Sequence, residues 1–452
     1  MARPRTRFRC TSCGHVETRW AGRCAGCTAW NTLVEETPAP GGVGTPPSKA
    51  RVLTPTPLQD VSVRGGGEVR LRVGIGELDR ILGGGLVAGS LVLLGGDPGV
   101  GKSTLLLMAL DALGRRGLQT LYVTGEESAA QVRLRADRLG LAGDGLSLLA
   151  ETDLPAVVEA VRRLRPAAVV MDSVQTLHDP ALQGVPGAVS QVRQVASQAM
   201  ALAKGEGIAT FLIGHVTKEG SLAGPRMLEH LVDTVVYFEG DGRSSLRMLR
   251  AVKNRFGPTG ETGLFEMRDE GLVEVPDASA RLLQERVPTA SGTAVVAAME
   301  GSRPVLAEVQ ALVGAPGLGS PARTAVGLDR GRLMMLLAVL GKLGLPMSER
   351  DVFVSAAGGL RIVEPAVDLG LVAAIASSFR DRALDPHALA FGEVGLVGEV
   401  RAVGHPLLRL KEAAQHGFRR AIVPASSKVE PPPGLSLVPV RTVREALDAL
   451  LR

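Results

Sequence analysis

Short apolar runs alternate with helical patterns across the first large part of the chain, from about Leu71 to His215. The apolar runs are continuous and bounded by glycine or polar residues, which is typical of strands buried on both faces. The segments between them have apolar positions at helical spacing, and each ends in glycine. The strand candidates are SLVLLGG (90–96), LQTLYVTGEES (118–128), PAAVVMDSVQT (166–176) and IATFLIGHVT (208–217), and the helix candidates are KSTLLLMALDALGRRG (102–117), QVRLRADRLG (131–140) and VRQVASQAMALAKGEG (192–207).

This alternation predicts an α/β domain with a parallel sheet that is covered by helices on both faces. Residues 233–257 then fit an antiparallel hairpin with Asp-Gly at its turn. The pattern breaks near residue 275 and restarts as a second region with strands and helices of its own, RGRLMMLLAVLGKLG (330–344) among the helices and FGEVGLVGEV (391–400) among the strands. We expect an α/β domain over 59–275 and a separate α+β domain over 285–452.

The N-terminal part differs from both domains. All four cysteines lie within the first 27 residues, and a stretch rich in proline and glycine, TPAPGGVGTPPSKA (37–50), follows them. Such a stretch cannot bury enough apolar surface to pack. We therefore expect a cysteine module over 1–30 and a linker over 31–58.

The cysteines form two C-x₂-C pairs that are ten residues apart: Cys10 with Cys13, and Cys24 with Cys27. Four thiolates at this spacing can enclose a tetrahedral Zn²⁺ with no open coordination position, so the site would be structural. Metal binding would supply the folding energy of so short a segment. A redox dithiol is the alternative. The module's contact could be DNA, another protein or the rest of this chain.

Composition changes this picture little. Of 452 residues, 45% are hydrophobic and 21% are charged, which is ordinary for a globular chain long enough for several domains. The formal net charge of +5 suits a polyanionic partner and is equally ordinary for a solvated surface. Because aromatic residues make up only 3%, an aromatic base-stacking platform is not expected as the main nucleic-acid surface.

Targeting signals are also missing from the pattern. No apolar stretch follows the basic N-terminus, so we do not expect a secretory signal. The longest apolar run, Leu333 to Leu340, is far shorter than the ~20 residues of a membrane span. A long chain with cysteines only at one end is not a disulfide scaffold. We expect a cytoplasmic protein without membrane association.

A phosphate-binding motif follows the first buried strand. The motif G-x-x-x-x-G-K-[ST] is matched by Gly96, Asp97, Pro98, Gly99, Val100, Gly101, Lys102 and Ser103, with Thr104 next in the helix. Its glycines let successive backbone N–H groups point at phosphate oxygens, and the helix start adds a positive dipole. Lys102 would contact the β and γ phosphates of ATP, and the Ser103 hydroxyl would bind Mg²⁺. A purely structural glycine turn is the alternative.

Polar residues follow three other strands. Asp172 ends the run VVM and is the expected second Mg²⁺ ligand, although it could instead cap a helix. Glu126 is the expected carboxylate that orients the attacking water, with Glu127 as an exposed charge at a helix start. His215 could sense the γ-phosphate by a hydrogen bond or be an ordinary polar residue.

These residues, read together, resemble a known family. The segments GELDRILGGGLVAGSLVLLGGDPGVGKSTLLL (76–107), YVTGEES (122–128), VVMDSVQT (169–176) and KNRFG (253–257) resemble the bacterial RadA family of recombination and repair proteins, and the likeness extends over essentially the whole chain. The resemblance implies a RecA-like P-loop ATPase core, preceded by a zinc module and followed by a Lon-protease-like domain. It also implies a hexameric ring that moves on single-stranded DNA and promotes branch migration of branched DNA alongside the RecA recombinase.

The resemblance assigns further residues. Lys253 and Arg255 of KNRFG would face the nucleotide of a neighbouring subunit, where a cation stabilises transition-state charge. Without the resemblance, they read as a basic hairpin facing solvent. Residues 178–191 and 216–230 resemble DNA-facing loops, with Lys218 and Arg226 as candidate phosphate contacts; loops of this composition can also be simple connectors.

The C-terminal region raises a rival function, an ATP-fuelled protease of the Lon type, which needs a serine nucleophile and a lysine base. The stretch matching the family's serine motif, residues 364–370, contains no serine; Ser377 and Ser378 lie further along the helix. The stretch matching the lysine motif, 404–407, contains no lysine, and Lys411 is one helical turn further on. We therefore expect an inactive protease domain kept for ring assembly. A non-motor regulatory ATPase is a third hypothesis, which the single P-loop disfavours.

Overall fold

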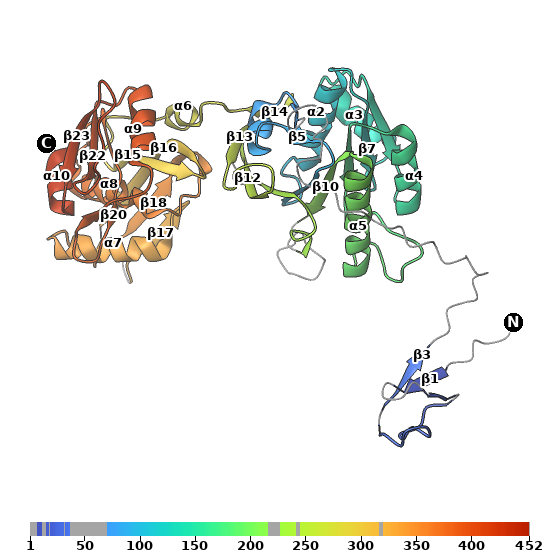
Figure 1. The fold of residues 1–452 in the computed structure, drawn as a ribbon. Helices are drawn as coiled ribbons and strands as arrows, with labels where there is room; N and C mark the ends of the chain where they lie inside the picture. The colour runs from blue at the N-terminus through green and yellow to red at the C-terminus, as the bar shows by residue number, and fades with distance from the viewer. Residues whose placement is uncertain are drawn as a thin grey trace, which may run out of the picture. The chain divides into compact units, whose positions relative to one another are not determined.

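The computed structural model describes residues 7–10, 15–17, 19–30, 32–36, 70–215, 227–240, 245–315 and 320–451. The chain divides into two compact units, Met1–Gly66 and Gly67–Arg452. Within the described segments, no helix is both long enough and apolar enough to cross a bilayer. The two units are described separately below, and Figure 1 labels their elements.

The N-terminal unit contains a small antiparallel sheet with the order β2-β1-β3. Its strands are β1 (Arg7–Cys10), β2 (Val16–Glu17) and β3 (Leu33–Glu36). Leu33 of β3 is buried with Cys10 and Cys24, and these three residues form the small core. The folded module therefore continues past residue 30, where the sequence pattern placed its end. The reason is that β3 brings an apolar residue to a core that the cysteine-rich segment cannot fill alone.

The second unit begins with a nine-stranded sheet in the order β14-β13-β12-β11-β6-β10-β9-β7-β8. The strands β11, β6, β10, β9, β7 and β8 are parallel, and β12, β13 and β14 extend the sheet in antiparallel fashion. Their bounds are β6 (Leu91–Gly96), β7 (Thr120–Thr124), β8 (Leu146–Ala150), β9 (Ala168–Asp172), β10 (Ala209–His215), β11 (Thr234–Glu239), β12 (Leu246–Asn254), β13 (Thr262–Arg268) and β14 (Gly271–Glu274).

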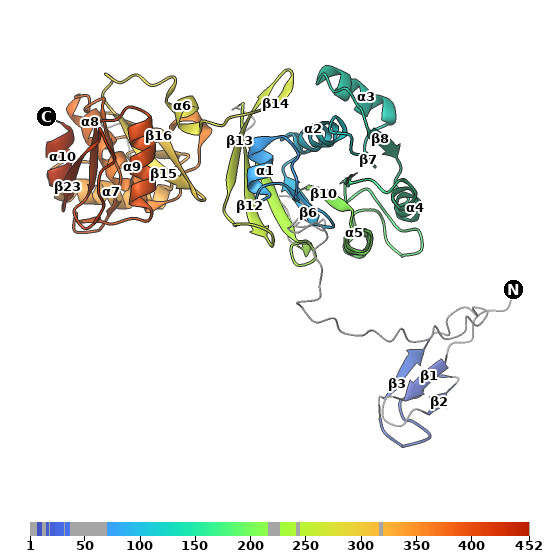
Figure 2. The ribbon, with the colours of Figure 1, turned by 45° about the horizontal axis from the view of Figure 1, so that its top comes forward.

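Helices cover both faces of this sheet, as Figure 2 shows for α1 and α2 on one side and α4 and α5 on the other. The strand β6 explains the arrangement, because Val92 and Leu94 enter one core while Leu91 and Leu93 enter the other. The helices are α1 (Gly76–Ile81), α2 (Lys102–Gly114), α3 (Ala129–Arg138), α4 (Leu154–Leu164) and α5 (Val189–Glu206). A short pair of strands, β4 (Arg70–Leu71) and β5 (Leu86–Val87), precedes β6.

The apolar alternation thus predicted the parallel sheet and its two helical layers, and the expected hairpin is the antiparallel pair β11–β12. The pattern did not single out α4. Its N-cap is Asp153, whose carboxylate accepts from the Ala156 N–H, and Pro155 occupies the first turn. These residues mark the start of the helix, and the spacing of apolar residues does not reveal them.

The C-terminal part of the second unit contains a seven-stranded mixed sheet in the order β17-β18-β16-β15-β19-β22-β23. Its strands are β15 (Thr293–Glu300), β16 (Arg303–Val313), β17 (Arg323–Val326), β18 (Val352–Ala356), β19 (Ala388–Ala390), β22 (Arg420–Pro424) and β23 (Ser436–Val440). Its helical elements are α6 (Ala278–Leu283), α7 (Arg330–Lys342), η3 (Ala357–Gly359), η4 (Pro365–Val367), α8 (Asp368–Arg380), α9 (Pro406–Gln415) and α10 (Val443–Leu450). The expected α+β composition is therefore observed.

Two cores lie on opposite faces of this second sheet. The larger one collects apolar side chains of α7, α8 and α10, and the smaller one packs Leu410 and Ala413 of α9 against Phe391 and Phe418. One element differs from expectation: the segment 391–400 is not one strand. It forms the antiparallel pair β20 (Glu393–Val394) and β21 (Val400–Arg401), because Gly395 and Gly398 turn the chain between them.

A buried ion pair ties α9 to the segment before α8. Arg409, whose side chain is 2% exposed, donates from Nη1 and Nη2 to the two carboxylate oxygens of Glu364 at 2.7 and 2.8 Å. Its Nε also donates to the Gly404 carbonyl at 3.0 Å, and its guanidinium lies 5.8 Å from the Phe391 ring centroid. This arginine is satisfied on every side, so removing it leaves a carboxylate without its partner.

We expect Arg409→Met to destabilise the C-terminal domain by about 3–5 kcal/mol, because Glu364 loses its charge partner. In calorimetry of the full chain, this is a drop of about 10 °C in the melting transition of that domain. The matched control is Arg401→Met, which breaks the exposed Arg401–Glu399 pair and should cost under about 1 kcal/mol. Equal effects of the two substitutions would contradict the buried pair's structural role.

Candidate active site

The candidate site lies where four neighbouring strands end. In the sheet register, His215 of β10 is opposite Gly96 of β6, and Thr124 of β7 is opposite Asp172 of β9. Because these strands are parallel, the segments that follow them meet at one edge of the sheet. The sequence motifs at 96–104, 124–127, 172 and 215 are therefore neighbours in space.

The loop from Gly96 to Ser103 has a backbone that only glycine allows at two places. Gly96 has φ 155°, and a Cβ there would lie 2.3 Å from the Phe238 carbonyl oxygen. Gly101 has φ 111° and is the N-cap of α2, without a side chain to accept the first helical N–H groups. Those N–H groups remain available for phosphate oxygens, which is the fit expected of an ATP cradle.

Lys102 is buried at the start of α2, with 3% of its surface exposed. Its ammonium donates to the carbonyl oxygens of Gly96 and Asp97 at 2.8 and 2.9 Å. Burial lowers the pKa of Lys102, while Asp172, Glu126 and Asp97 oppose that shift. The loop's own carbonyls thus hold the ammonium inside the cradle.

Asp172 is buried and is held from one side by a residue that the motifs did not reveal. The Tyr122 hydroxyl donates to Asp172 Oδ2 at 2.6 Å, and it is also in hydrogen-bond contact with Ser103. Burial raises the pKa of Tyr122 well above its usual range, and the charge of Asp172 adds to the shift. Tyr122 therefore links the two expected Mg²⁺ ligands. The signal in the sequence is its place in β7, two residues before the strand ends.

Glu126 and His215 face each other across the same edge. Glu126 Oε1 lies 3.0 Å from His215 Nε2, and this hydrogen bond is the main reason that the pKa of Glu126 falls to about 2. Such a carboxylate stays ionised at neutral pH and is a weak base. It can therefore orient a water molecule by accepting a hydrogen bond, but it takes up a proton poorly. At this distance His215, the candidate γ-phosphate sensor, contacts Glu126, the candidate water-orienting residue.

Glu127 lies differently from its neighbour. Its carboxylate accepts from Arg135 of α3, and its backbone N–H donates to Thr124 Oγ1 at 3.0 Å. The structure therefore gives the two adjacent glutamates separate surroundings. Glu126 is directed to the P-loop side, and Glu127 closes the start of α3.

A divalent cation would fit these groups. Ligand atoms of Glu126, Asp172 and His215 lie within 4.8 Å of one another. Asp172 Oδ1 is buried, and no hydrogen-bond partner for it lies among the described residues. An ionised oxygen that is buried in this way needs a positive partner. Asp172 and Ser103 are the residues that would hold Mg²⁺.

The KNRFG segment begins at the end of β12 and leads into the connection to β13. Lys253 of β12 donates to the carbonyls of Glu229 and Val232 at 2.6 and 2.8 Å, and burial together with Arg255 lowers its pKa. Arg255 is 61% exposed at its side chain and lies 3.9 Å from Asp233. Within one subunit, Lys253 is thus engaged by its own chain, whereas Arg255 reaches toward solvent.

The first DNA-loop candidate, residues 178–191, is folded around one buried side chain. Gln191 Nε2 donates to the carbonyls of Asp179 and Leu182 at 3.1 Å each, and its Oε1 accepts from the Asp179 N–H. The loop exposes Leu182 and Val185 rather than cationic side chains. The second candidate, 216–230, lies largely outside the described residues, and so do Lys218 and Arg226.

The cysteine module brings its thiols together. Sγ atoms of Cys10, Cys24 and Cys27 lie within 4.8 Å of one another, and Cys10 Sγ is 3.6 Å from Cys27 Sγ. The Gly26 N–H donates to Cys24 Sγ at 3.3 Å, a bond that stabilises a thiolate. Cys13 lies outside the described residues. The three described thiols fit a zinc ion, for which Cys13 would be the fourth ligand.

The C-terminal domain holds its nearest hydroxyl groups in structural roles. Ser377 Oγ accepts from the Gly292 N–H at 2.9 Å and donates to the Arg382 carbonyl at 2.5 Å. Ser378 Oγ accepts from the Val313 N–H at 3.0 Å. Lys411 is exposed on α9. Among the described contacts, neither serine has Lys411 as a partner.

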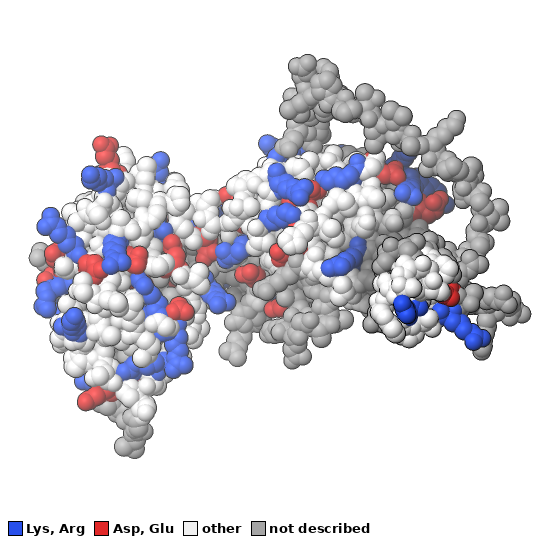
Figure 3. Space-filling view, turned by 60° about the horizontal axis from the view of Figure 1, so that its bottom comes forward, with Lys and Arg blue, Asp and Glu red and all other residues white. Residues whose placement is uncertain are grey.

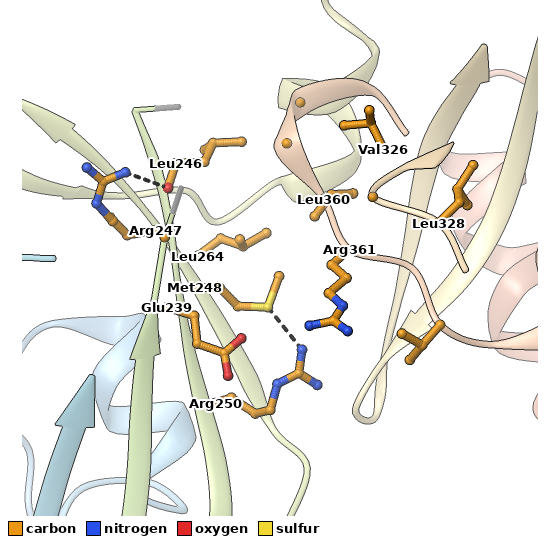
Figure 4. A pocket seen from close by; sticks show the side chains of 15 residues that line it. Glu239, Leu246, Arg247, Met248, Arg250, Leu264, Val326, Leu328, Leu360 and Arg361 are labelled. Atoms are coloured by element: carbon orange, nitrogen blue, oxygen red, sulfur yellow. Dashed lines mark hydrogen bonds between the residues drawn. The ribbon is translucent and has the colours of Figure 1, made fainter. Parts of the chain in front are cut away.

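One hollow lies away from the P-loop, between β11–β13 and the loops before α7 and α8. It has a volume of about 610 Å³, and its lining includes Leu246, Met248, Arg250, Leu360 and Arg361. Figure 4 shows Arg250 turned toward the Met248 sulfur, which accepts at 3.2 Å. Arg250 also pairs with Glu300 at 3.1 Å. The hollow joins the two domains of this unit and contains none of the expected site residues.

The fold and the site define a P-loop protein with a RecA-like α/β core and a cysteine-rich zinc-ribbon module. Comparisons with known proteins agree with this class. Residues 68–221 match the AAA domain family, and residues 8–35 match the rubredoxin metal binding domain family.

Relatives match over the full length. The chain is 47% identical to the DNA repair protein RadA of Bacillus subtilis, and 50% identical to that of Pseudomonas aeruginosa, with 100% of each chain covered. It is 48% identical to the RadA of Brucella abortus over 94% of this chain and 93% of the relative. The chain belongs to the RadA family of DNA repair proteins.

We expect Asp172→Asn to separate function from stability. The amide keeps the size of the side chain but removes a buried charge, so the melting temperature should hold or rise while Mg²⁺-dependent ATP hydrolysis falls by about 100-fold or more. Calorimetry and phosphate release measure the two effects. The matched control is Asp111→Asn, which weakens the bonds of another buried aspartate to Arg115 and the Gly143 N–H. That variant should lose stability and keep turnover; the reverse pattern would refute the metal role of Asp172.

Proposed function

We propose that this chain is an ATP-driven DNA translocase that works as a ring of identical subunits and remodels branched DNA during repair. The observation that carries the proposal is the convergence of the Lys102 cradle, Asp172, and the Glu126–His215 pair at one sheet edge. A cradle alone binds nucleotide, whereas a cradle with a metal-holding and a water-orienting carboxylate can hydrolyse it. The relatives are DNA repair proteins, and this indicates DNA as the substrate class.

The hydrolytic roles follow from the geometry. The loop N–H groups and Lys102 would bind the phosphates, and Ser103 and Asp172 would hold Mg²⁺, which would neutralise phosphate charge. Glu126, kept ionised by His215, orients the water that attacks the γ-phosphate. Loss of that phosphate would alter the hydrogen bond between His215 and Glu126, and His215 is the last residue of β10, directly before segment 216–230 in the sequence. This is a route from nucleotide state to a DNA-facing loop.

The proposal includes a cation supplied by the neighbouring subunit. Arg255 supports it best, because its side chain is 61% exposed and its Asp233 contact is long, at 3.9 Å. Lys253 would act beside it only after leaving the carbonyls of Glu229 and Val232. A trans-acting arginine makes hydrolysis depend on assembly, which is how a ring coordinates steps along a strand.

Partners follow from the same proposal. Single-stranded and branched DNA are the substrates, and the RecA recombinase is the protein with which the translocase acts. The proposed ring is a hexamer in the cytoplasm. The inactive protease-like domain would support ring assembly, since its Ser377 and Ser378 serve the fold rather than chemistry.

The first test is Lys102→Ala, which removes the cation from the cradle. We expect ATP turnover to fall at least about 100-fold, because the phosphate charge loses its fixed partner. Turnover is measured with and without single-stranded DNA, and stimulation by DNA in the parent protein is expected. Lys342→Ala, at an exposed position in the last turn of α7, is the matched lysine control and should retain turnover. An unchanged rate in Lys102→Ala would refute the nucleotide site.

The second test separates a trans role of Arg255 from a cis role. We expect Arg255→Ala to bind nucleotide normally but to lose about 10³-fold or more in turnover, the scale for an arginine finger. Mixed with Lys102→Ala subunits, it should regain activity, because each Arg255→Ala pocket can then receive an intact arginine from its neighbour.

The readout is phosphate release from co-assembled mixtures over a range of ratios, with each single variant as the baseline. Activity that never exceeds the sum of the two baselines would place Arg255 outside the neighbour's site. Exposed Arg268→Ala, which removes a side chain 52% exposed on the same antiparallel strands, is the control for a general loss of charge.

A further inference from the structure

We infer that the zinc module grips single-stranded nucleic acid by stacking bases on Trp20 and Trp30. This deepens the proposed function and rests on it, because it says how the translocase holds its strand outside the ATPase core. The chain has only two tryptophans, and both lie on this module. Their exposed fractions are 61% for Trp20 and 70% for Trp30.

The exposure of these rings is unexpected in a module that needs apolar side chains for its core. The core consists of three buried residues, Cys10, Cys24 and Leu33, and a small domain is expected to draw its largest apolar side chains inward. Here the two largest ones remain in solvent. Exposed tryptophan, whose indole N–H gives it a polar edge, is characteristic of a binding surface rather than of a hydrophobic core.

The two indoles border one spot on the surface. A Cβ built on Gly22 would lie 3.7 Å from Trp30 Cζ3 and 4.0 Å from Trp20 Cη2. Gly22 therefore leaves open the space between the rings, and both are within reach of one extended strand. Arg23 orients Trp30: its guanidinium lies 5.9 Å from the ring centroid, and its Nε donates to the Thr28 carbonyl at 3.0 Å.

The net charge of the N-terminal module indicates which class of partner it binds. Residues 1–36, which include β3, contain six arginines and three glutamates, a net of +3 out of the chain's +5. A zinc ion held by four thiolates would subtract two charges and leave a net of about +1, with the six arginines available to phosphates. One of the three carboxylates, that of Glu17, lies 3.4 Å from His15 Nε2. In Figure 3 the visible face of this module shows blue arginine atoms and one small red patch.

A positive surface with two exposed indoles fits single-stranded DNA better than an apolar protein face. Backbone phosphates need cations, and every base has a face that can stack on an aromatic ring without regard to sequence. Duplex DNA keeps its bases stacked on each other, so the rings would find no partner there. The low overall aromatic content does not oppose this inference, because two rings at one place suffice for stacking.

The full-length, zinc-loaded protein tests the inference directly, because its tryptophan emission comes from this module alone. A dye-labelled oligothymidine is titrated while dye anisotropy reports total binding and tryptophan emission reports stacking. We expect emission to be quenched in step with the rise in anisotropy. A duplex of equal length should quench less.

Four variants sharpen the test. Trp20→Ala and Trp30→Ala should each weaken oligothymidine binding by about tenfold, and Trp20→Phe and Trp30→Phe should restore most of it, since a phenyl ring still stacks. Leu134→Ala, which removes an exposed apolar side chain of α3, is the matched control and should bind as the parent does. Zinc content of one ion per chain verifies that each variant retains its folded module.

The outcomes are distinct. Rising anisotropy with unchanged tryptophan emission would mean that the strand binds elsewhere, and the inference would fail while the proposed translocase stands. Alanine variants that bind DNA normally but no longer retain the recombinase would make the surface a protein interface and also overturn it. If neither signal responds to DNA, both the inference and the proposed function fail.

Discussion

The turn of backbone after β6 is the constraint on which the rest of this protein depends. At Gly96 the chain passes so near to the Phe238 carbonyl that no side chain fits, and from there it wraps toward the start of α2. The wrap places Lys102 inside the loop and leaves the first N–H groups of α2 unpaired by any cap side chain. Phosphate binding is thus built from backbone, which explains why four apolar residues and a run of glycines are enough to specify it.

Much of this could be read from the sequence because it is local. The buried strands and helices follow from apolar periodicity, and the P-loop residues are contiguous. The role of Tyr122 could not be identified in this way, because it depends on a hydrogen bond to Asp172, fifty positions away. The same holds for Gln191, which folds the loop 178–191 through its bonds to backbone carbonyls. Tertiary partners of polar side chains are not encoded in spacing.

Domain limits show a related difficulty. The proline- and glycine-rich stretch suggested that the N-terminal module ends at residue 30, but β3 pairs with β1 and supplies Leu33 to a core of three residues. In a module this small, one apolar residue decides where the fold ends. The Arg409–Glu364 pair is a similar case. Both residues are polar and look like surface positions in the sequence, yet the pair joins α9 to the start of α8.

The distribution of tasks along the chain follows from what each part can bury. The central sheet has two full cores and can hold charged groups such as Lys102 and Asp172 in fixed positions, as hydrolysis requires. The N-terminal module has almost no core, so it cannot position groups for chemistry, but it can display rings and arginines at little cost. A motor needs one part that binds firmly and another that binds the strand more weakly and without regard to sequence. A strand bound tightly everywhere could not advance. The balance of charge agrees with this division, because residues 1–36 contribute +3 of the chain's net charge of +5.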